Sequence, residues 1–331
     1  MSSRVLARWG SARDQLEADG FCLLRQLLPG DTSREIGAEV TAALVGARLS
    51  DGSETASGQP AYLERTDSIV PPDLAGVARS EILEKLFHTP EFLECAASLL
   101  TIDIDDLFVH PNKYLRAVPP IESDLHYPAG VHQDYPELQG SLRQLAFWIP
   151  FFQVDSESGT LPVYPTGGVR RILPLTLADN PSGWATDGSC LPHPVVAELA
   201  PGDALVFHTL TPHGGSENRG AGWRASVECR VQPLADSIIE GNMQPIFSPS
   251  WDAHYRGWRE YAGYWYDRHP PVVPHDPTWE RWRDVEAVKE GRRGNIRAYT
   301  GLMIASEFGK SAPIRDEARE LLDEWRQIGL I

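Results

Sequence analysis

The stretch PGDALVFHTLTPHGGSENRGAGWRASVECRV, residues 201–231, carries the strongest fold signal in this chain of 331 residues. It contains two apolar runs, ALVFHTL at 204–210 and RASVECRV at 224–231, separated by a segment rich in glycine and other turn formers. Short apolar runs with such boundaries are typical of β-strands. The stretch therefore predicts two strands, and a hairpin would place them side by side.

Further runs of the same kind lie upstream, at 107–110 (LFVH), 142–152 (LRQLAFWIPFF) and 160–164 (TLPVY). Several short strands separated by turn clusters favour a β-sandwich or barrel. No predicted strand is followed by GxGxxG or GxxxxGK[ST], so the nucleotide-binding α/β folds lose their main support. We expect a mainly β core at about 105–235 within a single domain.

Both ends of the chain read as helix, at about 1–104 and in an extension at about 236–331. Thr32 and Glu35 have capping-box spacing, Thr89 precedes a first-turn proline, and residues 313–327 predict a charged terminal helix. One further helical stripe, expected to pack on the sheet, consists of Trp251, Tyr255, Trp258, Ala262 and Trp265. Residues 50–61 predict a mobile loop, and residues 165–203 a long loop of the kind that serves as a lid.

The charge balance excludes several partners. Thirty basic and 46 acidic residues give a formal net charge of -16, which argues against nucleic acid and against a polybasic membrane surface. No apolar run approaches the roughly 20 residues that span a bilayer, and the first ten residues lack the apolar core of a secretory signal. The four cysteines form no CxxC pair. We expect a cytoplasmic protein with reduced thiols.

The tripeptide His132-Gln133-Asp134 has the spacing of a metal site. Residues i and i+2 of a strand point to the same face, so His132 and Asp134 would offer an imidazole and a carboxylate to one point. A second histidine would complete the two-histidine, one-carboxylate set that binds Fe(II) with open positions. HxD alone is weak support, because both residue types are common.

His213 and Arg224 supply the missing parts, eleven residues apart. In a hairpin they would lie on adjacent strands near one pocket, where Arg224 could hold a carboxylate through paired charge-assisted hydrogen bonds. Ser226 shares the face of Arg224 and could donate another bond. The alternative is a turn histidine beside an arginine in a surface salt bridge.

Three segments together resemble the phytanoyl-CoA dioxygenase (PhyH) family: HQD at 132–134, WIPFFQVDSESGTLPVYPTG at 148–167, and PGDALVFHTLTPHGGSENRGAGWR at 201–224. The segment EADGFCLLRQLLPGD, from residue 17, is similar to the family's opening helix and strand. The resemblance runs from about residue 15 to 232. It implies a double-stranded β-helix, the cupin-like jelly roll, and an oxygenase that depends on Fe(II), 2-oxoglutarate and O2.

The resemblance also implies roles for individual residues. His132, Asp134 and His213 would be the catalytic iron ligands, and Arg224 would bind the distal carboxylate of 2-oxoglutarate. Trp148 resembles a position that lines the co-substrate site, although a plain core tryptophan fits equally. Lys113 would meet 2-oxoglutarate or substrate if it faces the pocket, and is otherwise a solvated lysine. His208 is expected in the core or behind the ligands.

The implied reaction is hydroxylation of an unactivated C–H bond of a small metabolite or specialised-metabolism intermediate, with release of succinate and CO2. Desaturation, epimerisation and cyclisation are variants that iron ligands do not distinguish. Related halogenases lack the carboxylate that Asp134 supplies. Two alternatives stay open: a cupin-like metal protein or isomerase that does not use 2-oxoglutarate, and a non-catalytic relative. The chain would act as a monomer or homodimer.

Overall fold

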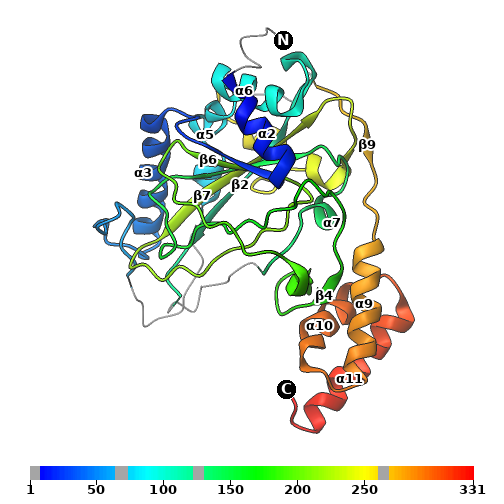
Figure 1. Ribbon diagram of the computed structural model, residues 1–331. Coiled ribbons are helices and arrows are strands. Elements are labelled where there is room, and N and C mark those ends of the chain that lie inside the picture. The colour runs from blue at the N-terminus through cyan, green and yellow to red at the C-terminus, as the bar shows by residue number, and fades with distance from the viewer. Residues whose placement is uncertain (1–7, 64–73, 122–129, 260–267) are drawn as a thin grey trace.

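The computed structural model describes residues 8–63, 74–121, 130–259 and 268–331 (Figure 1). Its centre is a five-stranded antiparallel sheet in the order β1-β6-β3-β7-β2. The strands are β1 (Phe21–Leu24), β2 (Leu107–Val118), β3 (Leu145–Pro150), β6 (Ala204–His208) and β7 (Arg224–Pro233). The predicted strands at 107–110, 142–152, 204–210 and 224–231 are confirmed within a few residues.

Side-chain alternation on β7 divides the sheet into two faces. Ala225, Val227, Cys229 and Val231 point into the main apolar core. Arg224, Ser226, Glu228 and Arg230 point to the other face, where they line a cavity. The two-residue period of the strand therefore places apolar side chains on the face that packs against the core, and polar side chains on the face that lines the cavity.

Helices of the first hundred residues cover the packing face. They are α2 (Gly10–Asp19), α3 (Gly30–Gly46), α4 (Ala75–Ala78), α5 (Glu81–Leu86) and α6 (Pro90–Leu100). Thr89 caps α6 as predicted, since its side chain accepts a hydrogen bond from Phe92 N. The predicted capping box at Thr32 and Glu35 is wrong: α3 begins earlier, at Gly30 after Pro29, and has no side-chain cap.

A second, less regular layer faces the sheet across a smaller apolar cluster. It contains β4 (Leu175–Leu177), paired with β5 (Trp184–Thr186), and isolated antiparallel bridges. The bridges join His132 to His213, Val163 to both His213 and Val195, and Val154 to Leu199. Two facing antiparallel layers flanked by helices form a jelly-roll core, and the described strands do not close into a barrel.

The predicted hairpin between β6 and β7 is wrong, because β3 lies between them. The connection at 209–223 leaves the sheet for the opposing layer, where His213 pairs with His132, and then returns to β7. β3 thereby hydrogen-bonds to both strands. Three further short elements lie in the adjoining parts of the chain: α7 (Tyr135–Leu138) and the parallel strands β8 (Ile238–Ile239) and β9 (Val272–Val273).

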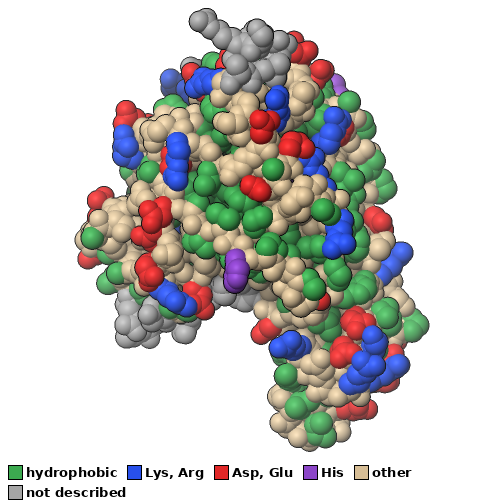
Figure 2. All heavy atoms as spheres, in the orientation of Figure 1, with side chains coloured by type: hydrophobic (Ala, Val, Ile, Leu, Met, Phe, Trp, Pro, Cys, Tyr) green, Lys and Arg blue, Asp and Glu red, His purple; other side chains and the backbone are tan. Residues whose placement is uncertain are grey.

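The C-terminal helices project from this core, at the lower right of Figure 1. They are α9 (Thr278–Gly291), α10 (Tyr299–Phe308) and α11 (Ala312–Gln327), which confirms the predicted terminal helix. They share their own apolar cluster, which includes Ala287, Leu302 and Trp325. Their outer surface carries mixed charges, whereas hydrophobic side chains gather at the centre of the face shown in Figure 2.

The predicted aromatic stripe is not one helix. Helix α8 (Trp251–His254) ends after one turn, and Trp258 instead donates from Nε1 to Arg79 O, 2.9 Å away. The rings of Trp251 and Tyr255 stack with centroids 5.5 Å apart. Ala262 and Trp265 lie outside the described residues. Trp258 therefore contacts the residue that ends α4, and the described aromatic side chains do not lie on one continuous helix.

The segment 50–61 is more ordered than predicted. Glu54 bridges to Pro60, and the buried Gln59 donates from Nε2 to Gln153 O at 3.0 Å. The segment 165–203 also contains β4, β5 and a 3-10 turn rather than a structureless lid.

The 3-10 turns among the described residues are η1 (Ile104–Asp106), η2 (Gly188–Cys190), η3 (Glu240–Met243) and η5 (Ile296–Ala298).

The four cysteines are all free thiols, and only Cys190 is exposed. None of the helices in the parts of the chain that the structure describes has the length and apolarity to cross a membrane.

Candidate metal and 2-oxoglutarate site

His132 and His213 are brought together by the backbone. His132 N donates to His213 O at 2.8 Å, and His213 N donates to His132 O at 2.9 Å. This reciprocal antiparallel pair sets the two imidazole rings 4.3 Å apart between centroids. The two histidines therefore meet across the opposing layer of the jelly roll, not across a hairpin of the main sheet.

The ring orientations leave one nitrogen of each histidine for a ligand. Nδ1 of His132 lies 2.8 Å from Gly130 O, and Nδ1 of His213 lies 2.9 Å from Thr211 O. A carbonyl partner requires a proton on Nδ1, so the lone pair is on Nε2. The Nε2 atoms lie 3.8 Å (His132) and 3.6 Å (His213) from Oδ1 of Asp134.

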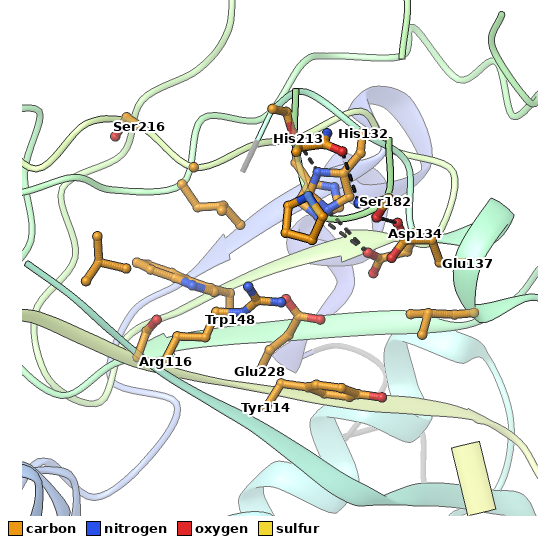
Figure 3. Close-up of a pocket in the computed structure, with 18 of the residues that line it drawn as sticks. Tyr114, Arg116, His132, Asp134, Glu137, Trp148, Ser182, His213, Ser216 and Glu228 are labelled. Carbon is orange, nitrogen blue, oxygen red and sulfur yellow. Dashed lines mark hydrogen bonds and ion pairs between the residues drawn. The ribbon is translucent and has the colours of Figure 1, made fainter. Parts of the chain in front are cut away.

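These three ligand atoms lie within 4.8 Å of one another, close enough to hold one metal ion (Figure 3). The donor set of two imidazoles and one carboxylate suits Fe(II) with open coordination positions. Asp134 and His213 are buried, whereas 29% of the His132 side chain is exposed. The site is therefore closed behind Asp134 and reachable beside His132.

Arg230 supports the carboxylate from behind. Its Nη2 lies 3.1 Å from Oδ2 of Asp134, on the carboxylate oxygen that does not face the histidines. Burial alone would raise the pKa of Asp134, but the charges of Arg230, His213 and His132 outweigh it and lower the pKa to about 2. Arg230 also pairs with Glu228 and lies over the Tyr114 ring, 4.5 Å from its centroid. Asp134 is thus fixed as an anion with one free oxygen.

Burial, and then the charge of the neighbouring His132, lowers the pKa of His213 to about 4. A neutral imidazole at neutral pH is the form that binds metal. The electrostatics of Asp134 and His213 therefore agree with the geometry.

Arg224 and Ser226 form the other end of the cavity. Arg224 Nη1 lies 3.0 Å from Ser226 Oγ, and its guanidinium lies 5.7 Å from the centroid of the Trp148 ring. Burial, and then the charge of Arg116, lowers the pKa of Arg224 to about 10. The buried Nε of Arg224 has no hydrogen-bond partner among the described residues. A buried guanidinium with a free donor suits a carboxylate ligand.

One cavity of about 320 Å³ connects the two ends. Its lining includes Tyr114 and Arg116 on β2 and Glu228 and Arg230 on β7, none of which we predicted from sequence. Register explains the grouping, because Tyr114 pairs with Glu228 and Arg116 with Ser226. The alternation on β2 was the available signal: Leu107, Val109, Leu115 and Ala117 are apolar, whereas the alternate positions from 110 to 116 are polar (His110, Asn112, Tyr114 and Arg116).

Lys113 does not face this cavity, so its predicted role is not met. It is buried on the helix side of β2, where Nζ lies 2.7 Å from Oε2 of Glu84 on α5 and donates to His110 O at 2.9 Å. The solvated lysine is wrong as well, because the Lys113 side chain is only 4% exposed. The strand pleat places Lys113 opposite to Tyr114 and Arg116.

His208 is buried at the end of β6 and is not among the residues that line the cavity. Neither of its ring nitrogens has a hydrogen-bond partner in the described part of the chain. Burial lowers its pKa to about 4. His208 is therefore a neutral core histidine, as expected from sequence.

A jelly roll with two histidines and a carboxylate facing one cavity defines the class of non-haem iron oxygenases. The family model described as Phytanoyl-CoA dioxygenase (PhyH) matches residues 16–226, and the chain belongs to this family. The family consists of Fe(II)- and 2-oxoglutarate-dependent oxygenases, so this chain is an enzyme of that class and uses Fe(II), 2-oxoglutarate and O2.

Solved structures share the fold. The epimerase SnoN in complex with Fe3+, alpha ketoglutarate and nogalamycin RO has 18% identity and a TM-score of 0.52, covering 70% of this chain and 86% of that chain. A second structure of SnoN, from nogalamycin biosynthesis, has 19% identity and a TM-score of 0.50, covering 70% and 85%. EvdO2 from Micromonospora carbonacea var. aurantiaca has 21% identity and a TM-score of 0.48, covering 72% and 94%. No curated protein matches the chain.

Proposed function

We propose that His132, Asp134 and His213 hold Fe(II), and that Arg224, with Ser226 and Trp148, holds the distal carboxylate of 2-oxoglutarate. The observation that carries this assignment is the placement of the three ligand atoms and of the Arg224 guanidinium, whose Nε has no partner among the described residues, on one cavity. Bound iron would supply the oxidative chemistry: 2-oxoglutarate, O2 and R–H give succinate, CO2 and R–OH. The protein residues orient the reactants and limit the access of water.

The groups around the ligands and at the far end of the cavity have separate roles. Arg230 keeps Asp134 ionised and leaves only Oδ1 free, which preserves open positions on the metal. The carbonyls of Gly130 and Thr211 hold both histidines in the tautomer that binds metal. Arg224 and Arg116 together make the far end of the cavity positive, which suits the dianionic co-substrate.

We infer that the substrate is a small metabolite, such as a specialised-metabolism intermediate, and that the C–H bond is hydroxylated. A cavity of about 320 Å³ that also takes 2-oxoglutarate has room for only a small substrate or the reacting part of a larger one. Asp134 supplies the carboxylate, which favours hydroxylation over halogenation. SnoN, an epimerase, shares the fold, so the fold alone does not determine the reaction.

An acyl-CoA substrate is disfavoured by charge. The net charge is -16, and the basic side chains at 170 and 292–293 are neutralised locally. The pairs are Arg170 with Glu17, Arg292 with Glu317, and Arg293 with Glu290. None of these arginines lines the cavity. We further propose that the enzyme acts in the cytoplasm as a monomer or homodimer.

The test is a turnover assay with Fe(II), O2 and 2-oxoglutarate labelled at C1, run against a panel of small hydroxylated, aromatic and acyl-CoA compounds. The proposal predicts that labelled CO2 and unlabelled succinate form in equal amounts, and that both form faster when an accepted compound is present. His132→Ala should abolish this turnover, whereas His193→Ala, at an exposed histidine, should leave it unchanged. Turnover of a panel compound that does not consume 2-oxoglutarate would favour the cupin-like alternative.

A further inference from the structure

One wall of the cavity is formed by the β4–β5 hairpin, which packs against helices that lie beyond the residues matched by the family model. The match ends at residue 226, and α9, α10 and α11 follow it. The β4–β5 hairpin contributes Asn180, Pro181 and Ser182 from its turn, and Trp184 from the start of β5, to the cavity lining. Figure 3 shows Ser182 beside Glu137, toward the end of the cavity opposite to Trp148 and Arg116. This hairpin therefore lines the cavity on the side away from the 2-oxoglutarate anchor.

The β4–β5 hairpin is packed into the C-terminal helices. Leu177 on β4 belongs to the apolar cluster that α9, α10 and α11 share. An added Cβ at Gly183 would lie 2.8 Å from Cδ of Arg283, and one at Gly301 on α10 would lie 3.4 Å from Cδ2 of Leu177 on β4 and 2.8 Å from Cβ of Ala287 on α9. The hairpin and the helices thus meet at van der Waals distance, with no space for a larger residue at either glycine.

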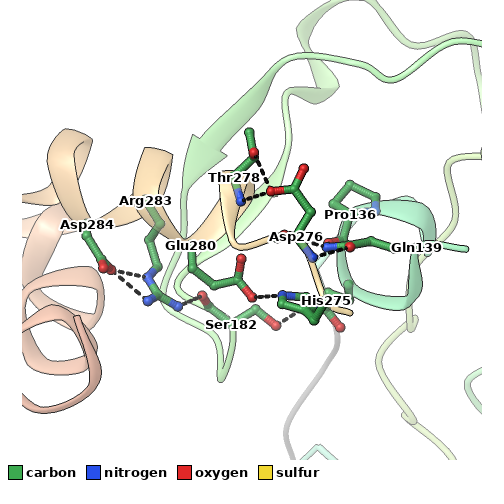
Figure 4. Close-up of polar contacts among 10 residues, drawn as sticks. Pro136, Gln139, Ser182, His275, Asp276, Thr278, Glu280, Arg283 and Asp284 are labelled. Carbon is green, nitrogen blue, oxygen red and sulfur yellow. Dashed lines mark hydrogen bonds and ion pairs between the residues drawn. The ribbon is translucent and has the colours of Figure 1, made fainter. Parts of the chain in front are cut away.

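Arg283 on α9 is the polar centre of this contact. Its Nη1 donates to Ser182 O at 3.2 Å, and its guanidinium lies 5.5 Å from the centroid of the Trp184 ring. Asp284 fixes the same guanidinium through Nε at 3.0 Å and Nη2 at 2.6 Å (Figure 4). Arg283 is buried, so these contacts are shielded from water.

A second tie joins the same extension to α7, which follows the ligand Asp134. Gln139 Nε2 donates to Asp276 O at 2.7 Å, and Asp276 N donates to Gln139 Oε1 at 2.8 Å. Helix α7 supplies Glu137 and Leu138 to the cavity, and Ser182 Oγ donates to Glu137. The C-terminal segment therefore contacts both the β4–β5 hairpin and α7. These two elements supply Ser182 and Glu137, which are hydrogen-bonded to each other, to one wall of the cavity.

We propose that the C-terminal helices form a specificity module that shapes the substrate side of the cavity, with Arg283 as its positioning residue. Arg283 touches neither the metal ligands nor Arg224, and acts through Ser182 and Trp184. The substrate wall then depends on α9, whereas the 2-oxoglutarate anchor on β7 does not. The inference rests on the proposed function for the identity of the substrate side.

Hydrogen–deuterium exchange of Arg283→Ala tests the positioning role on the protein without metal or ligand. Amides of residues 178–186 should exchange at least tenfold faster, and amides of 131–135 and 209–213 should keep their rates. The matched control is Arg281→Ala, at an exposed arginine on the same helix, which should change neither region. Arg283→Lys, which keeps the charge but loses the planar fork, replaces Arg283→Ala if that variant does not fold. Equal exchange of 178–186 in the Arg283 and Arg281 variants overturns the proposal.

Two ligand measurements separate specificity from general loosening. The Arg283 variant should bind Fe(II) and 2-oxoglutarate within twofold of the wild type. With the compound accepted in the turnover panel, its KM should rise at least tenfold while kcat changes less than threefold. Weaker 2-oxoglutarate binding and an unchanged KM would contradict a specificity role. If the wild type itself fails to bind 2-oxoglutarate, the proposed function fails, and the exchange experiment still decides the role of Arg283.

Discussion

Arg230 and Asp134 form a buried pair in which Nη2 lies 3.1 Å from Oδ2, while Oδ1 of the same carboxylate faces Nε2 of both histidines. The two oxygens of Asp134 are thereby divided between a fixed protein cation and the metal position. Asp134 would therefore hold a metal ion through Oδ1 alone, since Arg230 occupies Oδ2.

Replacing Arg230 should weaken metal binding. Arg230→Gln removes the cation that holds Asp134 and leaves Glu228 without its buried partner, and loss of such support costs about 10- to 100-fold in metal affinity. An anaerobic equilibrium titration with Fe(II) measures the change. Arg143→Ala, at an exposed pair with Asp236, is the control and should bind Fe(II) normally. Unchanged affinity in Arg230→Gln would show that the pair does not support the metal.

Ser226 should contribute modestly to 2-oxoglutarate binding. Its Oγ holds Nη1 of Arg224, so Ser226→Ala leaves the guanidinium in place but less constrained. We expect the Kd for 2-oxoglutarate to rise about fivefold, in line with roughly 1 kcal/mol for one hydrogen bond. Ser216→Ala is the matched control, because Ser216 also lines the cavity but donates to Thr160 O. A larger effect in Ser216→Ala would place the anchor elsewhere.

Lys113 should matter for stability and not for 2-oxoglutarate. Lys113→Met leaves Glu84 charged and buried, and breaking such a pair from one side costs about 3–5 kcal/mol of unfolding free energy. Adding Glu84→Gln should recover part of that loss in a double-mutant cycle measured by urea unfolding. The Kd for 2-oxoglutarate should stay within twofold. A stable Lys113→Met protein with much weaker 2-oxoglutarate binding would contradict this prediction and would assign Lys113 a role in binding 2-oxoglutarate.

His208 should make the fold less stable in mild acid. Its pKa is about 4 when folded and 6.5 in the reference state, so below pH 6.5 the unfolded chain takes up a proton that the folded chain does not. Stability is unaffected above pH 6.5 and falls as the pH drops from 6.5 to 4, by up to about 3 kcal/mol.

His208→Leu should remove that part of the pH dependence without destabilising the protein at pH 7.5, because neither ring nitrogen has a partner to lose in the described structure. Urea midpoints at pH 7.5 and pH 5 provide the comparison, with His193→Leu as the exposed control. An equally steep loss of stability in His208→Leu would assign the acid sensitivity to other groups.

Local patterns in the sequence predicted most of the main sheet and the central site. Strand alternation placed Arg224 with Ser226 on β7, because that pair depends only on neighbours two residues apart. The same rule grouped His132 with Asp134, although the expected strand is absent there: His132 forms an isolated β-bridge, and Asp134 has helical backbone angles at the start of α7. The same rule, applied to Leu107, Val109, Leu115 and Ala117, would have placed Lys113 on the apolar face. The charge of Lys113 instead favours a solvent-exposed side chain. No local sequence pattern indicates its buried partner Glu84, which lies 29 residues away.

The path of the chain between β6 and β7 could not be predicted from sequence. Whether β3 inserts between two strands depends on pairing across some 80 residues, and no local pattern encodes it. The contact between Arg283 and Ser182 spans 101 residues and has the same character. The sequence therefore predicted the chemical groups of the site better than the wall that encloses it.

The most direct measurement is an anaerobic absorbance titration of the metal-free protein with Fe(II) and 2-oxoglutarate, for the wild type, His132→Ala and Arg224→Ala. The account predicts a weak visible charge-transfer band in the wild type and no band in His132→Ala. Arg224→Ala should show the band only at higher 2-oxoglutarate concentrations. A wild-type protein that binds Fe(II) but shows no band at saturating 2-oxoglutarate would contradict the central claim.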